Sequence, residues 1–177
     1  MSVEALVPTI RLAVPADVAA IAEIQEASIL SLGAAVYGHD KARAWLRFGI
    51  EQSRGLLRQG EFFVADAGGL VVGVSGWSPD PDRLDTAWIR YVFVRPEVAR
   101  RGLGRRLVTT AENAALAAGR PRLLLWASLN ALGFYQALRY QRLRRATWPI
   151  AAGIDLDYVL MTKRLRRRRR LAAPPGR

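Results

Sequence analysis

The chain of 177 residues contains no cysteine and only one histidine, His39. The lack of cysteine excludes disulfide bonds, thiolate metal sites and a reaction that passes through an acyl-cysteine intermediate. Long apolar runs are missing as well, since Gly, Asp or Arg interrupts each of them within about ten residues, and we therefore predict no membrane-spanning segment. Residues 1–4 lack the basic start and apolar block of a signal peptide. A cytoplasmic protein without a metal site is the default expectation.

Positive charge is concentrated at the C-terminal end of the chain. The formal net charge is +12, and residues 163–177 contain eight cationic side chains and no acidic one. A run of five arginines followed by Leu-Ala-Ala-Pro-Pro-Gly-Arg is too self-repelling and too rich in proline to fold alone. We therefore predict one globular domain over residues 1–163 and a disordered arginine-rich tail over residues 164–177. Such a tail can bind RNA, the ribosome or an anionic membrane electrostatically, or it can have no function at all.

The most informative stretch is an apolar strand that leads into a loop rich in arginine and glycine, over residues 91–107. Pro96 stops the strand because proline has no N–H for the sheet ladder. Gly102 and Gly104 lack a Cβ, so backbone N–H groups can point into one concavity and a ligand can approach the main chain closely. A helix is predicted to begin near Leu103, and its unpaired N-terminal donors would lie beside that concavity. Four neighbouring arginines add positive charge, so the segment favours a phosphate or diphosphate, although a solvated turn before an amphipathic helix has the same composition.

Two common phosphate-binding loops do not fit this segment. A Walker loop needs Gly-Lys-Ser/Thr, which does not occur, and a Rossmann loop needs a small residue at Leu107 and an acidic one at Arg122. The segment instead resembles the acyl-CoA loop of the GNAT superfamily of N-acetyltransferases, Gln/Arg-x-x-Gly-x-Gly/Ala after a Val-x-Pro step. Val94-Arg95-Pro96 and Gly102-Leu103-Gly104 fit that pattern. Ala99 occupies its first position, and Arg100 is the candidate substitute.

A second segment also resembles this superfamily. Residues 123–127 form a short apolar run typical of a buried strand, and residues 128–138 are expected to form a helix. Asn130 and Tyr135 match the Asn and the Phe-Tyr pair of the second GNAT signature. Arg139 stands where the superfamily usually has Gly, so the turn there is expected to differ. The two signatures together cover residues 91–140.

The remaining periodicity predicts an α/β fold with one mixed sheet. The order of elements is β-α-α-β-β-β-α-β-α-β-β, which implies a mostly antiparallel sheet with helices on both faces, as in the GNAT acyl-CoA N-acyltransferases that the chain resembles. The strands are expected at residues 9–14, 61–66, 70–77, 85–94, 123–127, 140–145 and 154–163, and the helices at 15–32, 40–58, 103–118 and 128–138.

The resemblance implies direct transfer of the acetyl group of acetyl-CoA to a primary amine in a ternary complex. It implies that Tyr135 is the acid at the CoA sulfur and that Asn130 hydrogen-bonds the pantetheine or a bridging water. The alternative for Tyr135 is a core aromatic residue beside Phe134. The residues expected to contact the cosubstrate are Val92, Phe93, Val94, Arg100, Arg101, Gly102, Leu103, Gly104, Arg105, Asn130 and Tyr135. The amine can belong to a small molecule, an amino acid, an antibiotic or a protein N-terminus, and a homodimer is plausible.

The general base is not evident from the sequence. Many relatives have Glu six residues before the Val of Val-x-Pro, and here that position is Trp88. The candidates that remain are a water chain and four side chains, namely Asp80, Asp85, Glu61 and His39, of which His39 is also typical of a solvated loop residue. Three tryptophans and one arginine are candidates for the acceptor pocket or for the core, namely Trp45, Trp77, Trp88 and Arg90. Two other functions stay open, an acyl-CoA-binding sensor without catalysis and an RNA- or ribosome-associated factor that acts through the tail.

Overall fold

The computed structural model of the protein describes residues 7–56 and 60–166, with side chains described for all of these except 50–56. Within this part of the chain seven strands form one sheet in the order β1-β2-β3-β4-β5-β7-β6. Every neighbouring pair is antiparallel except β4 and β5. The strands are β1 (Thr9–Leu12), β2 (Glu61–Ala67), β3 (Leu70–Pro79), β4 (Thr86–Val94), β5 (Arg122–Ser128), β6 (Gln141–Ala151) and β7 (Ile154–Arg164).

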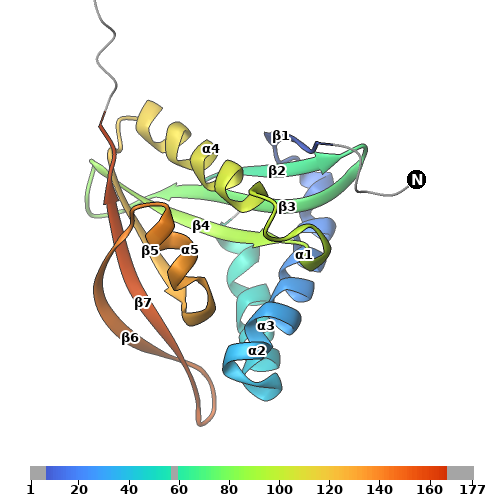
Figure 1. Ribbon diagram of the computed structural model, residues 1–177. Coiled ribbons are helices and arrows are strands. Elements are labelled where there is room, and N and C mark those ends of the chain that lie inside the picture. The colour runs from blue at the N-terminus through green and yellow to red at the C-terminus, as the bar shows by residue number, and fades with distance from the viewer. Residues whose placement is uncertain (1–6, 57–59, 167–177) are drawn as a thin grey trace, which may run out of the picture.

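Helices cover both faces of the sheet, as Figure 1 shows. On one face, α4 (Leu103–Ala117) and α5 (Leu132–Ala137) pack through Val108, Ala111 and Tyr135 against apolar side chains of the sheet. On the other face lie α1 (Val18–Ser28), α2 (Ala34–Tyr37) and α3 (His39–Leu56). The predicted mixed α/β architecture is confirmed.

The first helical region is longer than expected. A 3-10 turn (Pro15–Asp17), α1, a π-helical turn (Ile29–Gly33) and α2 run without a break from Pro15 to Tyr37. Gly33 permits a close approach to α3, because a Cβ there would lie 2.9 Å from the ring of Trp45. Gly38, with φ +81°, ends the run, and α3 begins at His39. The prediction of a helix that ends at residue 32 was therefore wrong.

The sequence predicted no membrane-spanning segment, but this continuous helix is one candidate by length and composition. Pro15–Tyr37 has 23 residues and a mean hydropathy of 1.3, which by length and composition is enough to cross a membrane. Ile21 and Ile24 on this helix are buried against β2 and β3 side chains such as Phe62 and Val74. The helix is thus part of the domain core on one side.

The C-terminal strands extend beyond their predicted ends. β6 continues to Ala151 and includes Pro149, which the edge of a sheet tolerates because an N–H there needs no strand partner. A tight turn at Gly153, with φ +70°, joins β6 to β7. Arg164, predicted as the start of the tail, is the last residue of β7. Leu165, the next residue of the predicted tail, donates its N–H to the carbonyl of Pro121 at 2.8 Å, and residues 167–177 lie outside the described residues.

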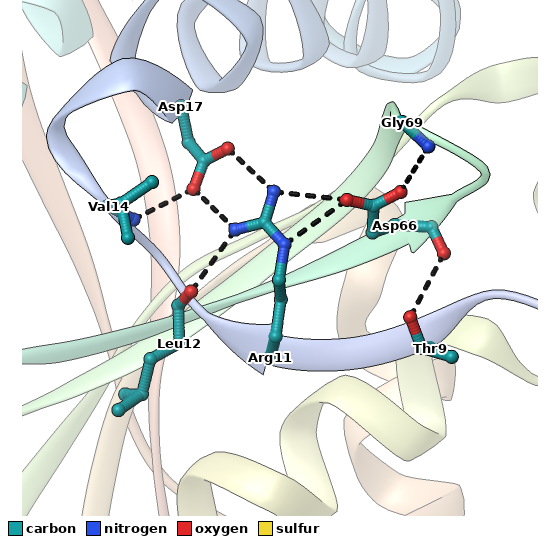
Figure 2. A network of polar contacts seen from close by, with 7 residues as sticks. All are labelled: Thr9, Arg11, Leu12, Val14, Asp17, Asp66 and Gly69. Atoms are coloured by element: carbon teal, nitrogen blue, oxygen red, sulfur yellow. Dashed lines mark hydrogen bonds and ion pairs between the residues drawn. The ribbon is translucent and has the colours of Figure 1, made fainter.

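A polar network joins β1 to β2 and to the start of the first helix (Figure 2). The two terminal nitrogens of Arg11 bind the carboxylate of Asp17 at 2.7 and 2.9 Å, and its Nε donates to Asp66 at 3.1 Å. Asp17 is 6% exposed and also accepts the backbone N–H of Val14 at 2.8 Å. These hydrogen bonds lower the pKa of the Asp17 carboxyl, with the Arg11 guanidinium as the largest cause.

Candidate active site

The sheet opens between β4 and β5, its only parallel pair in the described chain. The two strands pair only from Thr86 to Trp88 and from Arg122 to Leu124. Beyond those positions the chains diverge, so the edge of residues 92–94 that faces β5 carries no ladder. An irregularity between Arg90 and Phe93 in the pairing with β3 accompanies this opening, and Tyr91 there has φ +53°. The divergence leaves backbone amides of β4 beside an open space.

The loop after β4 presents the N-terminus of α4 to the same space. Arg100 and Gly102 have positive φ values of 62° and 81°, which turn the chain sharply before α4 begins at Leu103. No side chain caps the N-terminus of this helix, and the described residues provide no other hydrogen-bond partner for the amides of residues 103–105. Free amides at a helix N-terminus favour an anion through both their N–H groups and the helix dipole.

A cleft of about 690 Å³ lies where the diverging strands meet this helix. Most of the residues predicted to bind the cosubstrate line it, namely Val92, Phe93, Val94, Arg100, Gly102, Gly104, Arg105, Asn130 and Tyr135. Two do not. Arg101 is exposed away from the lining, and the side chain of Leu103 is buried with Leu107 and Val72 below α4, so Leu103 can offer only its backbone amide.

Tyr135 lies in the cleft wall with only 7% of its surface exposed. Its hydroxyl forms no hydrogen bond with any described residue, and burial raises the pKa of this phenol above its usual value of about 10. The ring packs edge-on against Phe134 and Tyr140, with centroids 5.0 and 5.7 Å away. Tyr135 therefore presents a protonated hydroxyl to the cleft on a ring that its neighbours hold in place.

A buried ion pair supports the ring of Tyr140 behind Tyr135. The carboxylate of Glu112 on α4, 4% exposed, accepts a hydrogen bond from the Tyr140 hydroxyl at 2.9 Å. Lys163 of β7 binds both oxygens of the same carboxylate at 2.8 and 2.7 Å. The network ties α4, the end of α5 and β7 together. No local sequence pattern predicts it, because its members lie 28 and 51 positions apart.

None of the described residues that line the cleft is a carboxylic acid or a histidine. His39 is exposed at the start of α3, and Asp85 lies 3.8 Å from Arg122 at the far end of β4. Glu61 accepts a hydrogen bond from Trp77 at 3.2 Å. Asp80 is the candidate base that lies next to the cleft wall, because it accepts the indole N–H of Trp88 at 2.8 Å and Trp88 stacks on the cleft residue Trp126.

The tryptophans proposed for the acceptor pocket divide between two roles. Trp77 is 6% exposed and belongs to the main core, which corrects its place among the pocket candidates. Trp45 lines the cleft and packs edge-on against Tyr37, whose hydroxyl accepts the N–H of Leu129 at 2.7 Å. Tyr158 of β7 also lines the cleft and was not predicted. The sequence gives little indication that Tyr158 lines a cleft, since a lone tyrosine in a strand is more often part of a core.

Comparison with known families identifies the fold. The model of the acetyltransferase (GNAT) family matches residues 23–140. The chain belongs to the GNAT acetyltransferase family. A GCN5-related N-acetyltransferase from Rhodopseudomonas palustris is 29% identical, with 89% of this chain and 96% of that chain covered and a TM-score of 0.76.

Two further structures of the GNAT type were solved with the coenzyme. The protein yncA from Salmonella typhimurium, solved with acetyl-CoA, is 25% identical over 95% of this chain and 98% of its own, with a TM-score of 0.64. The paiA N-acetyltransferase from Thermoplasma acidophilum, in complex with coenzyme A, is 19% identical over 90% and 99%, with a TM-score of 0.68, and shows the fold alone. No curated protein matches the sequence.

Arg139 departs from the GNAT pattern and lies at the end of α5. Arg139, at the usual glycine position, adopts φ +67°. Tyr140 donates its N–H to the carbonyl of Tyr135 at 3.0 Å and Arg139 donates to Gln136 at 2.9 Å, which is the Schellman arrangement of a helix end. Arginine thus adopts the left-handed conformation here at a conformational cost.

Proposed function

We propose that this GNAT protein transfers the acetyl group of acetyl-CoA directly to a primary amine while both substrates are bound. The observation that carries the proposal is the alignment of three features on one cleft, namely free helix amides, an open strand edge and a buried phenol. Each corresponds to one part of acetyl-CoA, which has a pyrophosphate, a pantetheine arm and a thioester.

The pyrophosphate fits the loop before α4. Backbone amides from Gly102 to Arg105 are free of other described partners, and Arg100 and Arg105 add positive charge at the cleft wall. Gly104 lines the cleft and leaves space there for a ligand, although a Cβ would make only an ordinary contact of 3.4 Å with the ring of Phe134. The pantetheine arm then enters between β4 and β5, where it can hydrogen-bond to the free edge of residues 92–94 as an extra strand would.

The thioester carbonyl is placed where backbone N–H groups of β4 can stabilise negative charge. Attack by the amine nitrogen forms the N–C bond and puts charge on the carbonyl oxygen, which accepts hydrogen bonds from those groups. The C–S bond then breaks, and the leaving thiolate takes the proton of the Tyr135 hydroxyl. A thiol has a pKa near 8.5 and a phenol near 10, so this transfer costs at least about 2 kcal/mol, which is small beside a catalytic barrier.

The attacking amine must lose its proton before transfer. For an alkylamine of pKa about 10.4 this loss costs on the order of 4 to 5 kcal/mol at pH 7. Asp80 can receive the proton through a water molecule, because its carboxylate lies behind Trp88 at the margin of the cleft. Solvent then returns a proton to the Tyr135 phenolate and closes the cycle.

A calorimetric titration with acetyl-CoA, followed by release of free thiol across a panel of amines, tests the proposal. We expect binding and amine-dependent release of CoA. Binding without release on any amine would support an acyl-CoA sensor instead, a reading that the lack of a carboxylate or imidazole among the described cleft residues favours. A protein that does not bind acetyl-CoA would contradict both the transferase function and the sensor function.

A further inference from the structure

Three tryptophans form a continuous wall beside the cleft, on strands that are separate in the sequence. Trp88 of β4 stacks on Trp126 of β5, with ring centroids 6.2 Å apart and an interplanar angle of 19°. Trp148 of β6 meets Trp126 edge-on at 6.4 Å, and Phe48 of α3 packs on Trp148 at 6.2 Å. Trp148 remains 45% exposed. We call Trp88, Trp126 and Trp148 the tryptophan wall.

The wall lies on the sheet face that α1 to α3 cover. Ala87, Ile89, Leu125 and Ala127 are buried with α4 and α5, so the residues between them, including Trp88 and Trp126, point to the opposite face. Trp126 also lines the cleft. The wall therefore continues the cleft away from the helix that is proposed to hold the pyrophosphate, toward the side from which an acceptor can enter.

Two guanidinium groups lie on the wall. The Arg90 guanidinium lies 5.0 Å from the ring centre of Trp88, and that of Arg144 lies 5.2 Å from the ring centre of Trp126. Arg144 is exposed, whereas Arg90 is half-buried and burial lowers its pKa. Among the described residues Arg90 forms one hydrogen bond, a long one of 3.4 Å from Nε to Ser78, and no ion pair.

A partly buried guanidinium is costly unless its neighbours replace the water that it has lost, and the charge of Asp80 compensates this cost for Arg90 only in part, without forming an ion pair. A bound carboxylate would compensate this cost by accepting two parallel hydrogen bonds from the guanidinium nitrogens. Trp126, which lines the cleft, and Trp148, which is 45% exposed, offer apolar surface against which an aromatic ring can pack. The Arg90 guanidinium and the tryptophan rings belong to one continuous surface, so together they favour a molecule that carries both a carboxylate and an aromatic ring.

We propose that the acceptor amine is an aromatic amino carboxylate, with its ring on the tryptophan wall and its carboxylate on Arg90. The inference rests on the proposed transferase function and names the substrate class of that same cleft. Arg90 and Arg144 also make the surroundings positive, which disfavours an ammonium and favours the neutral amine that attacks. Polyamines have neither a carboxylate for Arg90 nor a ring for the tryptophan wall, and the two guanidinium groups disfavour their positive charges.

Four amines separate the two parts of the proposal. L-phenylalanine has the ring and the carboxylate, phenethylamine lacks the carboxylate, L-alanine lacks the ring, and spermidine lacks both. We expect kcat/KM for L-phenylalanine to exceed that for phenethylamine and for L-alanine by roughly ten- to a hundredfold, the value of one charge-assisted contact or one stacked ring. Equal or higher values for spermidine or phenethylamine would overturn the proposal.

Variants locate the two contacts. Arg90→Gln should remove most of the preference for L-phenylalanine over phenethylamine, since a carboxylate contact is lost only where a carboxylate exists. Trp126→Leu should instead reduce the preference for L-phenylalanine over L-alanine. Arg145→Gln is the matched control, because Arg145 is exposed and adjacent to Arg144 in sequence, on the opposite face of β6.

The outcomes distinguish this inference from the function on which it rests. Acetyl-CoA binding and acetylation of amines other than aromatic amino carboxylates would refute the substrate class and keep the transferase function. No binding of acetyl-CoA at all would refute the transferase function itself. An Arg90→Gln variant with an unchanged preference would show that Arg90 does not contact the acceptor and would overturn the proposal even if L-phenylalanine were the best substrate.

Discussion

Replacement of Tyr135 by phenylalanine tests the leaving-group step of the mechanism. The change removes one hydroxyl that has no hydrogen-bond partner among the described residues and keeps the ring that packs on Phe134 and Tyr140. We therefore expect the free energy of unfolding to change by less than about 0.5 kcal/mol. Without the phenol proton the thiolate must leave unprotonated or wait for solvent, and kcat should fall by roughly ten- to a thousandfold, equivalent to about 1.4 to 4 kcal/mol of barrier.

The assay is steady-state release of CoA thiol, together with calorimetric binding of acetyl-CoA. The affinity for acetyl-CoA should stay within about twofold, because the hydroxyl acts on the leaving group and contributes little to ground-state binding. Tyr158→Phe is the matched control, since Tyr158 is a second cleft tyrosine whose phenol pKa is raised by burial. An unchanged kcat for Tyr135→Phe, or an equal loss in both variants, would refute the role of Tyr135 as the acid.

Three further predictions concern stability, each measured by urea denaturation. Arg11 lowers the pKa of the Asp17 carboxyl in the folded protein, so the stability that this carboxylate contributes is complete above the unfolded pKa of about 3.9. That contribution is lost as the pH falls below this value. Asp17→Asn should therefore reduce the loss of stability between about pH 5 and pH 2. Arg139→Gly should raise the free energy of unfolding by about 0.5 to 1 kcal/mol, since glycine adopts φ +67° without strain. Glu112→Gln should lower it by about 3 kcal/mol because Lys163, only 19% exposed, loses its partner.

Each stability prediction has a control within the chain. Asp85→Asn removes an exposed carboxylate 3.8 Å from Arg122 and should leave the acid profile unchanged. Gly119 ends α4 in the same hydrogen-bond arrangement as Arg139 ends α5, with φ +79°, so Gly119→Ala should destabilise the protein by about 1 kcal/mol. Lys163→Met removes the charge on the other side of the buried pair, and a change below about 1 kcal/mol in both Glu112 and Lys163 variants would contradict the account of that pair.

Local signals in the sequence were enough to predict the backbone of the segment that leads from β4 into α4. The Val-x-Pro step and the two glycines fix a strand end, a turn and a helix start within a short stretch, and all three depend on backbone preferences of the residues themselves. The helix end at Gly119 was predictable for the same reason. The position of the first helix end was not, because Gly33 lies inside the helix to make room for Trp45, and a contact of that kind is set by tertiary packing.

Trp88 and Arg90 were candidates for the acceptor pocket from the sequence. The contacts of Trp88 with Trp126 and of Trp126 with Trp148 were not predictable, because those contacts depend on strand register. Trp88 and Trp126 meet only because β4 and β5 pair in parallel from Thr86 and Arg122 onward, a register that no local pattern specifies. The same holds for the contact of Asp80 with Trp88, which brings a carboxylate from the residue after β3 close to the cleft residue Trp126. Homodimer formation and any role of residues 167–177 stay predictions.

The central claim is that free amides at the start of α4 hold the pyrophosphate of acetyl-CoA. The most direct measurement compares the calorimetric affinities of acetyl-CoA and acetyl-pantetheine, which lacks the pyrophosphate, for the native protein and for Gly104→Asp. The substitution places a carboxylate in the first turn, where it suits the helix dipole and repels a phosphate. We predict that acetyl-CoA binds at least roughly tenfold more tightly than acetyl-pantetheine and that Gly104→Asp removes this difference. Equal affinities for the two ligands, or a Gly104→Asp variant that binds acetyl-CoA as the native protein does, would contradict the account.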